Sequence, residues 1–180
     1  MKKNIWNNNG TLIGSIDKSN LNYGAFIETT YIDNKPYILL SGRNHSESYD
    51  YNNNNLKKYK SNNINNDYLL VNLFNKNNIL YFICSDRDGF IIIFEFLSSN
   101  EIYSVLVYSE VNALCSLNQK YLIIGDDNKE IKVFDFERKS FYKNLRCHDN
   151  NILGIEKIKI KEKGEYIISY DYNDIKIWII

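Results

Sequence analysis

Only a few side chains in this sequence could do chemistry. There are two histidines, His45 and His148, and three widely spaced cysteines, Cys84, Cys115 and Cys147. A catalytic histidine needs a nucleophile and an orienting acid beside it, and no local signature supplies that pair. A zinc site needs closely spaced ligand pairs, which these residues do not form. The sequence therefore predicts no catalytic residue, no cofactor and no metal ion.

The remaining features of these residues point to structural roles. The cysteines are odd in number and each lies beside apolar or strand-like neighbours, which is typical of reduced, buried thiols rather than a disulfide framework. His45 lies in the polar stretch Asn44–Ser48, which is typical of a solvated loop or a strand edge.

Two acidic clusters resemble calcium loops only faintly. Asp86–Gly89 and Asp126–Glu130 lack the glycine at the sixth position and the glutamate at the twelfth. Asp, Asn and Gly are also the residues that tight turns require, so we expect two turns. The sequence contains no glycine-rich phosphate loop, nucleophile elbow or kinase signature.

The basic segment Lys157–Lys163 alternates lysine with isoleucine before it ends in charged residues. This pattern is typical of a strand with one solvated face that runs into a turn. The alternative is a patch that binds phosphate or phosphoinositide.

Composition narrows the class of protein further. The 180 residues are 44% hydrophobic and 24% charged with a formal net charge of zero, which predicts one ordinary globular domain, 1–180. A neutral chain has no excess of positive charge to attract nucleic acid or an anionic membrane. Met1–Trp6 is not followed by an apolar stretch, and no run approaches the roughly 18 apolar residues of a spanning helix. These features predict a cytoplasmic protein without a membrane span, with the nucleus as the alternative location.

Asparagine is frequent along the whole chain and forms runs such as Asn52–Asn55. We expect these runs to be solvated loop insertions; the alternative is tracts that aggregate or bind a partner.

Short apolar blocks bounded by Asn, Asp, Gly and Ser predict an all-β fold, and their spacing predicts repeats. An aromatic residue ends a short strand-like run at intervals of 43, 45, 40 and 44 residues, at Trp6, Tyr49, Phe94, Phe134 and Trp178. Small residues that close the preceding strand keep intervals of 44, 40 and 44, at Ser41, Ser85, Gly125 and Ser169. Two agreeing periods of this size indicate the blades of a β-propeller, with units at approximately 7–49, 50–94, 95–134 and 135–180.

One unit shows the predicted strands clearly. Strands are expected at 111–114, 121–125, 131–136 and 140–145, with a polar turn at 126–130. Four antiparallel strands in roughly 43 residues is the architecture of one blade. The chain is therefore expected to form about four such blades.

These residues resemble the WD40 repeat over essentially the whole chain. Ile175–Trp178, Ile131–Asp135 and Asp88–Glu95 look like the third strand of that repeat and its closing Trp-Asp, although no unit has a true Trp-Asp pair and the first keeps Tyr49-Asp50. Cys147-His148 resembles the Gly-His step of the family.

The resemblance assigns a structural role to His148. In the family this histidine hydrogen-bonds a strand serine and a turn aspartate behind the closing tryptophan. The matching residues here would be Ser169 and Trp178, whereas Tyr172 occupies the position expected for the aspartate and Asp171 lies beside it.

The two ends of the sequence predict how the repeats close. Residues 11–17 look like an outer fourth strand, and the last unit stops after its third strand. We expect these segments to pair and close a ring of four blades. The alternative is an open arc that belongs to a larger propeller.

The function expected from the resemblance and from the missing chemistry is a non-catalytic scaffold that presents propeller loops and rims to other proteins. Tyr103, Tyr108 and Tyr142 are candidate anchors for a peptide, with packing between blades as the alternative. Two alternatives remain: a partial propeller that contributes blades to a larger assembly, and a ligand or enzymatic site in the central channel. The partner and the oligomeric state are not indicated by the sequence.

Overall fold

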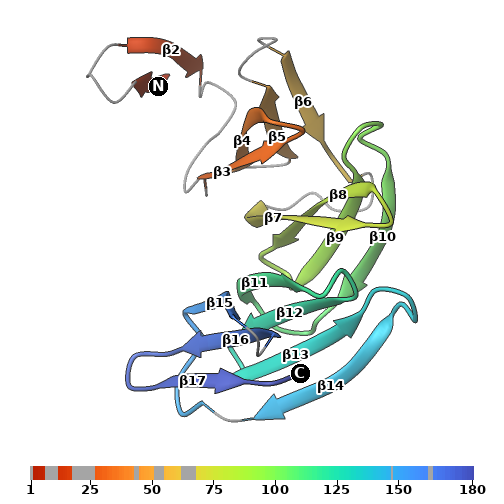
Figure 1. Ribbon diagram of the computed structural model, residues 1–180, viewed down its shortest axis with the longest axis vertical. Coiled ribbons are helices and arrows are strands. Elements are labelled where there is room, and N and C mark those ends of the chain that lie inside the picture. Colours follow the sequence, from red (N-terminus) through yellow and green to blue (C-terminus); the bar gives the residue numbers. More distant parts are fainter. Residues whose placement is uncertain are drawn as a thin grey trace.

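The chain folds into a series of small antiparallel sheets. The computed structural model describes residues 2–6, 12–17, 27–42, 45–50, 55–61, 68–146, 148–161 and 164–180. Among these residues there are strands and turns but no helix. The sheets follow one another along a curve (Figure 1).

Four of the sheets are propeller blades, numbered here in chain order. Blade 1 contains β3 (Ile27–Ile32), β4 (Lys35–Gly42), β5 (His45–Asp50) and β6 (Asn55–Tyr59); blade 2 contains β7 (Tyr68–Lys76), β8 (Ile79–Asp86), β9 (Phe90–Glu95) and β10 (Glu101–Leu106); blade 3 contains β11 (Val111–Leu117), β12 (Tyr121–Asp126), β13 (Glu130–Asp135) and β14 (Ser140–Arg146); blade 4 contains β15 (Gly154–Ile160), β16 (Gly164–Tyr170) and β17 (Ile175–Trp178). The predicted all-β, four-bladed propeller fold with antiparallel blades is confirmed. Within the described residues blade 4 has three strands.

The turn between the first and second strands is built in the same way in blades 1 to 3. Each turn has two central residues with positive φ: Asp33 and Asn34 (50° and 61°), Asn77 and Asn78 (52° and 63°), and Asn118 and Gln119 (52° and 51°). Tight hairpins of this hand match the twist of the strands and favour Asn and Asp at both positions. Four asparagines of the chain thus form these turns on one rim of the molecule.

The core lies between the blades rather than within one sheet. A first apolar cluster joins blades 1 and 2 around Phe82 and Phe94, a second joins blades 2 and 3 around Ile93 and Phe134, and a third joins blades 3 and 4 around Ile167. Each sheet buries both of its faces only when it has a neighbour on each side. The predicted aromatic positions Phe94 and Phe134 are fully buried in these clusters, and Trp178 is partly buried.

The predicted pairing of residues 11–17 with the last blade is wrong. The strand exists as β2 (Leu12–Asp17), but its partner is β1 (Lys2–Trp6), and the two form a separate sheet. Figure 1 shows β2 near the N-terminus, far from β17, so the blades form the open arc that was the alternative. Pairing two neighbouring segments closes a short loop, whereas pairing with β17 would close nearly the whole chain at a larger cost in chain entropy. Trp6 ends β1 as predicted; its side chain lies outside the described residues.

A search of the described part of the chain for a helix long and apolar enough to cross a membrane finds none.

Candidate functional site

Blade 4 brings together the polar residues that the sequence analysis connected with His148. Ser169 lies at the end of β16 and Trp178 at the end of β17, and the chain before β15 places His148 beside them. The Trp178 Nε1–H donates to Ser169 Oγ at 2.8 Å, and Ser169 Oγ lies 2.7 Å from His148 Nε2. Because the serine oxygen accepts from tryptophan, its own proton is available for His148 Nε2.

The fourth member of this cluster is Asp171, not Tyr172. Asp171 Oδ2 lies 3.2 Å from His148 Nδ1, close enough for an electrostatic contact although it is not aligned as a hydrogen bond. Tyr172 is exposed in the turn that follows. The turn between β16 and β17 therefore presents the aspartate one position earlier than the family pattern placed it.

An Asp-His-Ser series invites comparison with a hydrolase triad, which uses the same residue types. Here all three side chains are buried, and the serine oxygen already accepts a hydrogen bond from Trp178. A nucleophilic serine must be open to its substrate on the side away from histidine. The arrangement instead holds the hairpin of β16 and β17 against the segment before β15, which is a structural task.

Backbone groups of the surrounding turn stabilise Asp171 in its charged form. Burial alone would raise the pKa of Asp171, but the backbone N–H groups of Asn173, Asp174 and Asn150 donate to its carboxylate and, together with the His148 side chain, hold its pKa well below the usual range. Asp171 is therefore a carboxylate that stabilises the turn, not a proton donor.

Blade 3 places a different polar cluster in the corresponding position. Asp126 Oδ2 lies 2.5 Å from Lys132 Nζ and accepts from Ser109 Oγ at 2.5 Å. Lys132 Nζ also donates to the Val107 carbonyl at 2.9 Å. Lys132 and Asp126 are both buried, so each charge depends on the other.

The acidic clusters are turns, as predicted. Asp86 Oδ1 accepts from the Phe90 N–H at 2.7 Å, and Asp126 Oδ1 accepts from the Glu130 N–H at 3.0 Å. Burial raises the pKa of Asp86 more than its backbone hydrogen bonds lower it. Within the described ranges no group of three or more His, Cys, Asp or Glu side chains is placed to hold a metal ion.

The other residues considered from the sequence are dispersed. Cys84 and Cys115 are buried thiols, as predicted, whereas Cys147 lies outside the described residues. His45 begins β5, and its side chain is likewise not described. The first part of the basic segment forms β15, as predicted, and exposed Lys157 lies 4.0 Å from Glu165. The prediction of one solvated face is wrong, because from Glu156 to Ile160 residues on both faces of this strand are exposed or half-buried.

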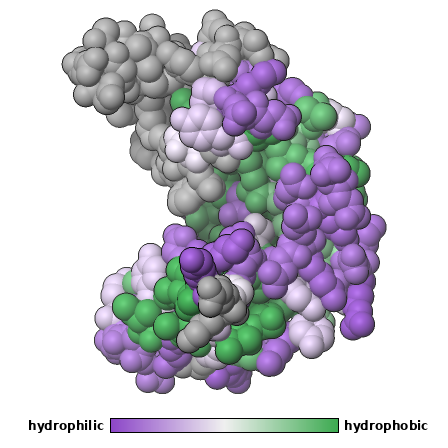
Figure 2. Space-filling model, viewed as in Figure 1, coloured by the Kyte–Doolittle hydropathy of each residue, from purple (hydrophilic) through white to green (hydrophobic). Residues whose placement is uncertain are grey.

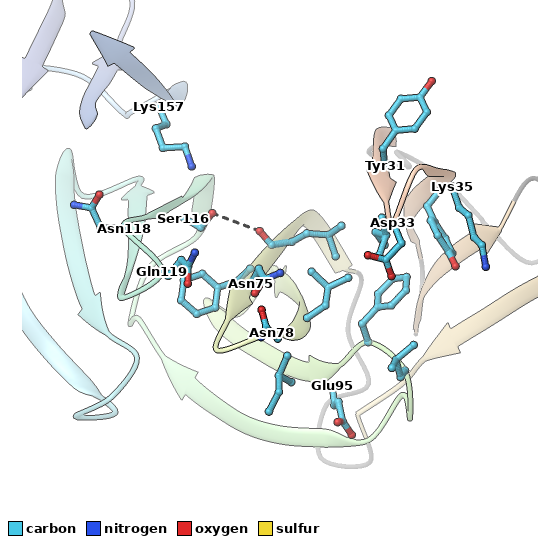
Figure 3. A pocket seen from close by; sticks show the side chains of 18 of the residues that line it. Tyr31, Asp33, Lys35, Asn75, Asn78, Glu95, Ser116, Asn118, Gln119 and Lys157 are labelled. Carbon is cyan, nitrogen blue, oxygen red and sulfur yellow. Dashed lines mark hydrogen bonds between the residues drawn. The ribbon is translucent and has the colours of Figure 1, made fainter. Parts of the chain in front are cut away.

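A hollow lies on the rim where the first and second strands turn (Figure 3). Its volume is about 970 Å³. Its lining comes from all four blades and from both polar and apolar residues: Tyr31, Ile32, Asp33, Lys35, Tyr37, Leu73, Phe74, Asn75, Asn78, Ile79, Leu80, Glu95, Phe96, Leu97, Ser116, Asn118, Gln119, Lys157 and Glu165. Figure 3 shows Lys157 of blade 4 across the hollow from Tyr31 and Lys35 of blade 1.

The chemistry of the hollow suits recognition. Tyr31, Ile79 and Leu97 are exposed apolar side chains, and amide side chains at the turns, such as Asn78 and Gln119, can donate and accept hydrogen bonds. Lysines and carboxylates are both present, so no single charge dominates. Exposed apolar anchors surrounded by polar groups are the usual composition of a protein-binding surface.

Sequence reasoning missed this hollow, although a signal was present. The turn pairs that begin at Asp33, Asn77 and Asn118 recur at intervals of 44 and 41 residues, which is the period of the blades. The three tyrosines chosen instead lie elsewhere. Tyr103 stacks on Phe134 and donates to the Lys139 carbonyl, Tyr142 stacks on Tyr121, and Tyr108 is exposed in the connection between blades 2 and 3.

No protein-family model and no curated protein sequence matches this chain. Among solved structures, the chain is similar to the crystal structure of the computationally designed Ika4 protein, with a TM-score of 0.67 and 15% sequence identity over 88% of this chain and 93% of that chain. At this identity the similarity concerns the fold alone.

Proposed function

We propose that this protein is a non-catalytic, WD40-like interaction scaffold that binds a segment of a partner protein in the hollow on the turn rim. The observation that carries the proposal is the lining of the hollow. It combines exposed Tyr31 and Leu97 with amide-bearing turns, all held by strands that pack in apolar clusters between successive blades. A rigid backing lowers the entropy lost on binding.

The kind of partner follows from the chemistry of this lining. The amide and charged side chains offer both donors and acceptors, which an extended peptide backbone needs, and the apolar residues offer positions for its side chains. The polar cluster of His148, Ser169 and Trp178 supports the WD40-like part of the proposal, because the resemblance assigned these residues to one hydrogen-bonded group.

The test is affinity capture from the native cell followed by mass spectrometry, with three proteins compared. The wild type is expected to retain a protein partner, and a Tyr31→Ala, Leu97→Ala double variant is expected to lose at least nine-tenths of it. Tyr172→Ala is the control, because Tyr172 is equally exposed but lies in a turn on the opposite rim. Retention by the double variant, or loss in the control alone, would contradict the proposal.

A second candidate function, a partial propeller that contributes blades to a larger assembly, is favoured by the exposed face of blade 4. On that face Ile175 and Ile177 are open to solvent.

A further inference from the structure

Blade 4 has no outer strand within the described residues. In blades 1 to 3 the third strand pairs with a fourth strand on its outer side: β5 with β6, β9 with β10 and β13 with β14. The third strand of blade 4 is β17, which pairs with β16 alone in the described part of the chain. Figure 1 shows β17 at the C-terminal end of the arc, and Figure 2 shows hydrophobic residues gathered over this part of the molecule. The outer edge of β17 therefore presents the backbone groups with which each of the other blades binds one more strand.

The outer strand of blade 3 is exposed on its way past blade 4. In blade 2 the outer strand β10 is half-buried apart from Ile102, because blade 3 lies beside it. Tyr103 of β10 stacks on Phe134 and donates to the Lys139 carbonyl at 3.2 Å. In β14, by contrast, every residue except Leu145 is exposed. The two strands have the same place in the repeat, so the difference comes from the blade that follows each of them.

Lys143 occupies in β14 the position that Tyr103 occupies in β10. Tyr103 pairs with Ile93 and Lys143 pairs with Val133, and these two partners are equivalent residues of the third strand. Residues that lie directly opposite each other on paired strands share one face of the sheet. Val133 belongs to the apolar cluster between blades 3 and 4. Lys143 therefore lies on the side of blade 3 that borders blade 4.

The charge of Lys143 is not balanced within the described part of the chain. Arg138 and Arg146, the cations on either side of it, contact the carboxylates of Asp135 and Glu130. Lys143 is exposed, and no described carboxylate lies within ion-pair distance of it. An exposed cation thus stands where blade 2 has a tyrosine that packs on the next blade.

The open edge of β17 has two different sides. Trp178 belongs to the cluster between blades 3 and 4, so Trp178 and Lys176 lie on the side toward blade 3. Ile175 and Ile177 lie on the opposite side and are 75% and 63% exposed. A strand added to this edge places its side chains alternately beside the two isoleucines and toward β14. Apolar side chains suit the first set, and an acidic side chain in the second set suits Lys143.

We propose that the edge of β17 binds an extended segment of a partner protein as the outer strand of blade 4, and that this segment alternates apolar with acidic side chains. Hydrogen bonds between the two backbones supply affinity, and the alternate side chains supply specificity. Lys143 selects an acidic segment, because opposite charges favour one partner and like charges disfavour another. The inference does not depend on the proposed function, since neither β14 nor β17 lines the hollow.

The probe for the first test is a fluorescent peptide that copies β10, the outer strand of blade 2. Ser104 of β10 pairs with Ile92, the residue equivalent to Lys176, so position 104 of a docked peptide lies on the side toward blade 3. Two peptides are compared, one with Ser104→Glu and one with Ser104→Lys. Fluorescence anisotropy with the full chain should show that the glutamate peptide binds about tenfold more tightly. Equal affinities, or no binding of either peptide, would overturn the proposal.

Variants of the protein locate the bound peptide. Lys143→Glu is expected to reverse the preference in favour of the lysine peptide, and an unchanged preference contradicts the proposal. Lys159→Glu is the matched control, because Lys159 is an exposed lysine on the first strand of blade 4, and it should keep the wild-type preference. The Tyr31→Ala, Leu97→Ala variant should bind the glutamate peptide as wild type does. A loss of binding there would place the peptide in the hollow and refute binding at β17.

Pairing through the backbone is tested with N-methyl groups, which remove N–H donors from the peptide. Alternate residues of a strand direct their N–H groups to opposite edges. N-methylation of one alternate set in the glutamate peptide should therefore abolish binding, and methylation of the other set should leave most of it. Equal effects of the two sets would rule out strand pairing.

A second copy of the chain is the other occupant that this edge could take. Size exclusion with light scattering should give the same number of protein copies with and without the glutamate peptide. A dimer that the peptide separates into single chains would show that a second copy occupies the edge, and the proposal of a partner protein would then be wrong.

Discussion

Blades 3 and 4 are successive repeats with the same strand arrangement, but they bury different polar residues next to the third strand. Behind the third strand, blade 3 buries a Lys132–Asp126 ion pair with Ser109, whereas blade 4 buries His148, Ser169 and Trp178 with Asp171 at the edge. Gly125 of blade 3 stands where blade 4 has Ser169. The comparison teaches that the two blades share a backbone architecture, while the polar cluster that holds the hairpin to the segment before the blade's first strand can differ as a whole set.

The largest difference in stability between the two blades is expected for substitution of Lys132. Lys132→Met should lower the free energy of unfolding by about 3 to 5 kcal/mol, because it leaves the Asp126 carboxylate buried without its cation. Lys176 is the corresponding lysine of blade 4 and contacts Asp174 near the surface, so Lys176→Met should cost under about 1 kcal/mol. Urea denaturation at one fixed protein concentration measures both. Equal losses in the two variants would refute the distinction.

The next largest effect is expected for the aromatic residue at the end of the third strand, which is buried to different extents in the two blades. Phe134→Ala should cost about 3 to 5 kcal/mol, since the ring is fully buried between blades 2 and 3. Trp178 is only partly buried, so Trp178→Ala should cost less, about 2 to 3 kcal/mol. The midpoints of thermal unfolding should rank in that order. A larger loss for Trp178→Ala would show that its hydrogen bond to Ser169 outweighs burial of the ring.

Substitutions at Gly125 and Ser169, which occupy the same position in blades 3 and 4, test whether one residue of a polar cluster can be exchanged without the others. Gly125→Ser should cost about 1 to 3 kcal/mol, because a Cβ at Gly125 would lie 2.6 Å from Ile152 Cγ2 and 3.0 Å from Ile155 Cδ1. Ser169→Ala should cost a similar amount for another reason, since His148 Nε2 and Trp178 Nε1 lose their shared partner. Urea midpoints report both losses. An unchanged midpoint for Gly125→Ser would mean that blade 3 accepts the serine on its own.

The smallest expected effect is on the stability of the protein at acidic pH. The pKa of Asp171 is lowered in the folded protein, so its contribution to stability is complete above the unfolded value of about 3.9 and is lost as the pH falls below that value. Asp171→Asn should therefore flatten the loss of stability between about pH 5 and pH 3. Denaturation midpoints measured across that range provide the comparison. Parallel curves for wild type and variant would show that the carboxylate is not held in its charged form.

The hollow and the contact between Asp171 and His148 show which features could not be predicted from the sequence. The repeat period located the third strands and the residues that end them, because alternation and spacing are local properties of the chain. The hollow is lined by residues from all four blades, and no local pattern states which turns will face each other. Asp171 illustrates the same limit at one residue, since a one-position difference in the turn decided whether Asp171 or Tyr172 reached His148.

By itself, the sequence determined the all-β class, the four blades, the four strands of blade 3 and the buried cysteines at 84 and 115. The physical reason is that the alternation of apolar residues in strands, the turn residues and the positions of the aromatic side chains are local features of each repeat of some 40 to 45 residues. Only the tertiary structure decided that β2 pairs with β1, that the arc stays open, and that Ile175 and Ile177 are exposed. Those outcomes depend on which segments far apart in the sequence come into contact. Local sequence preference does not decide this, because the entropy cost of closing short and long loops also enters.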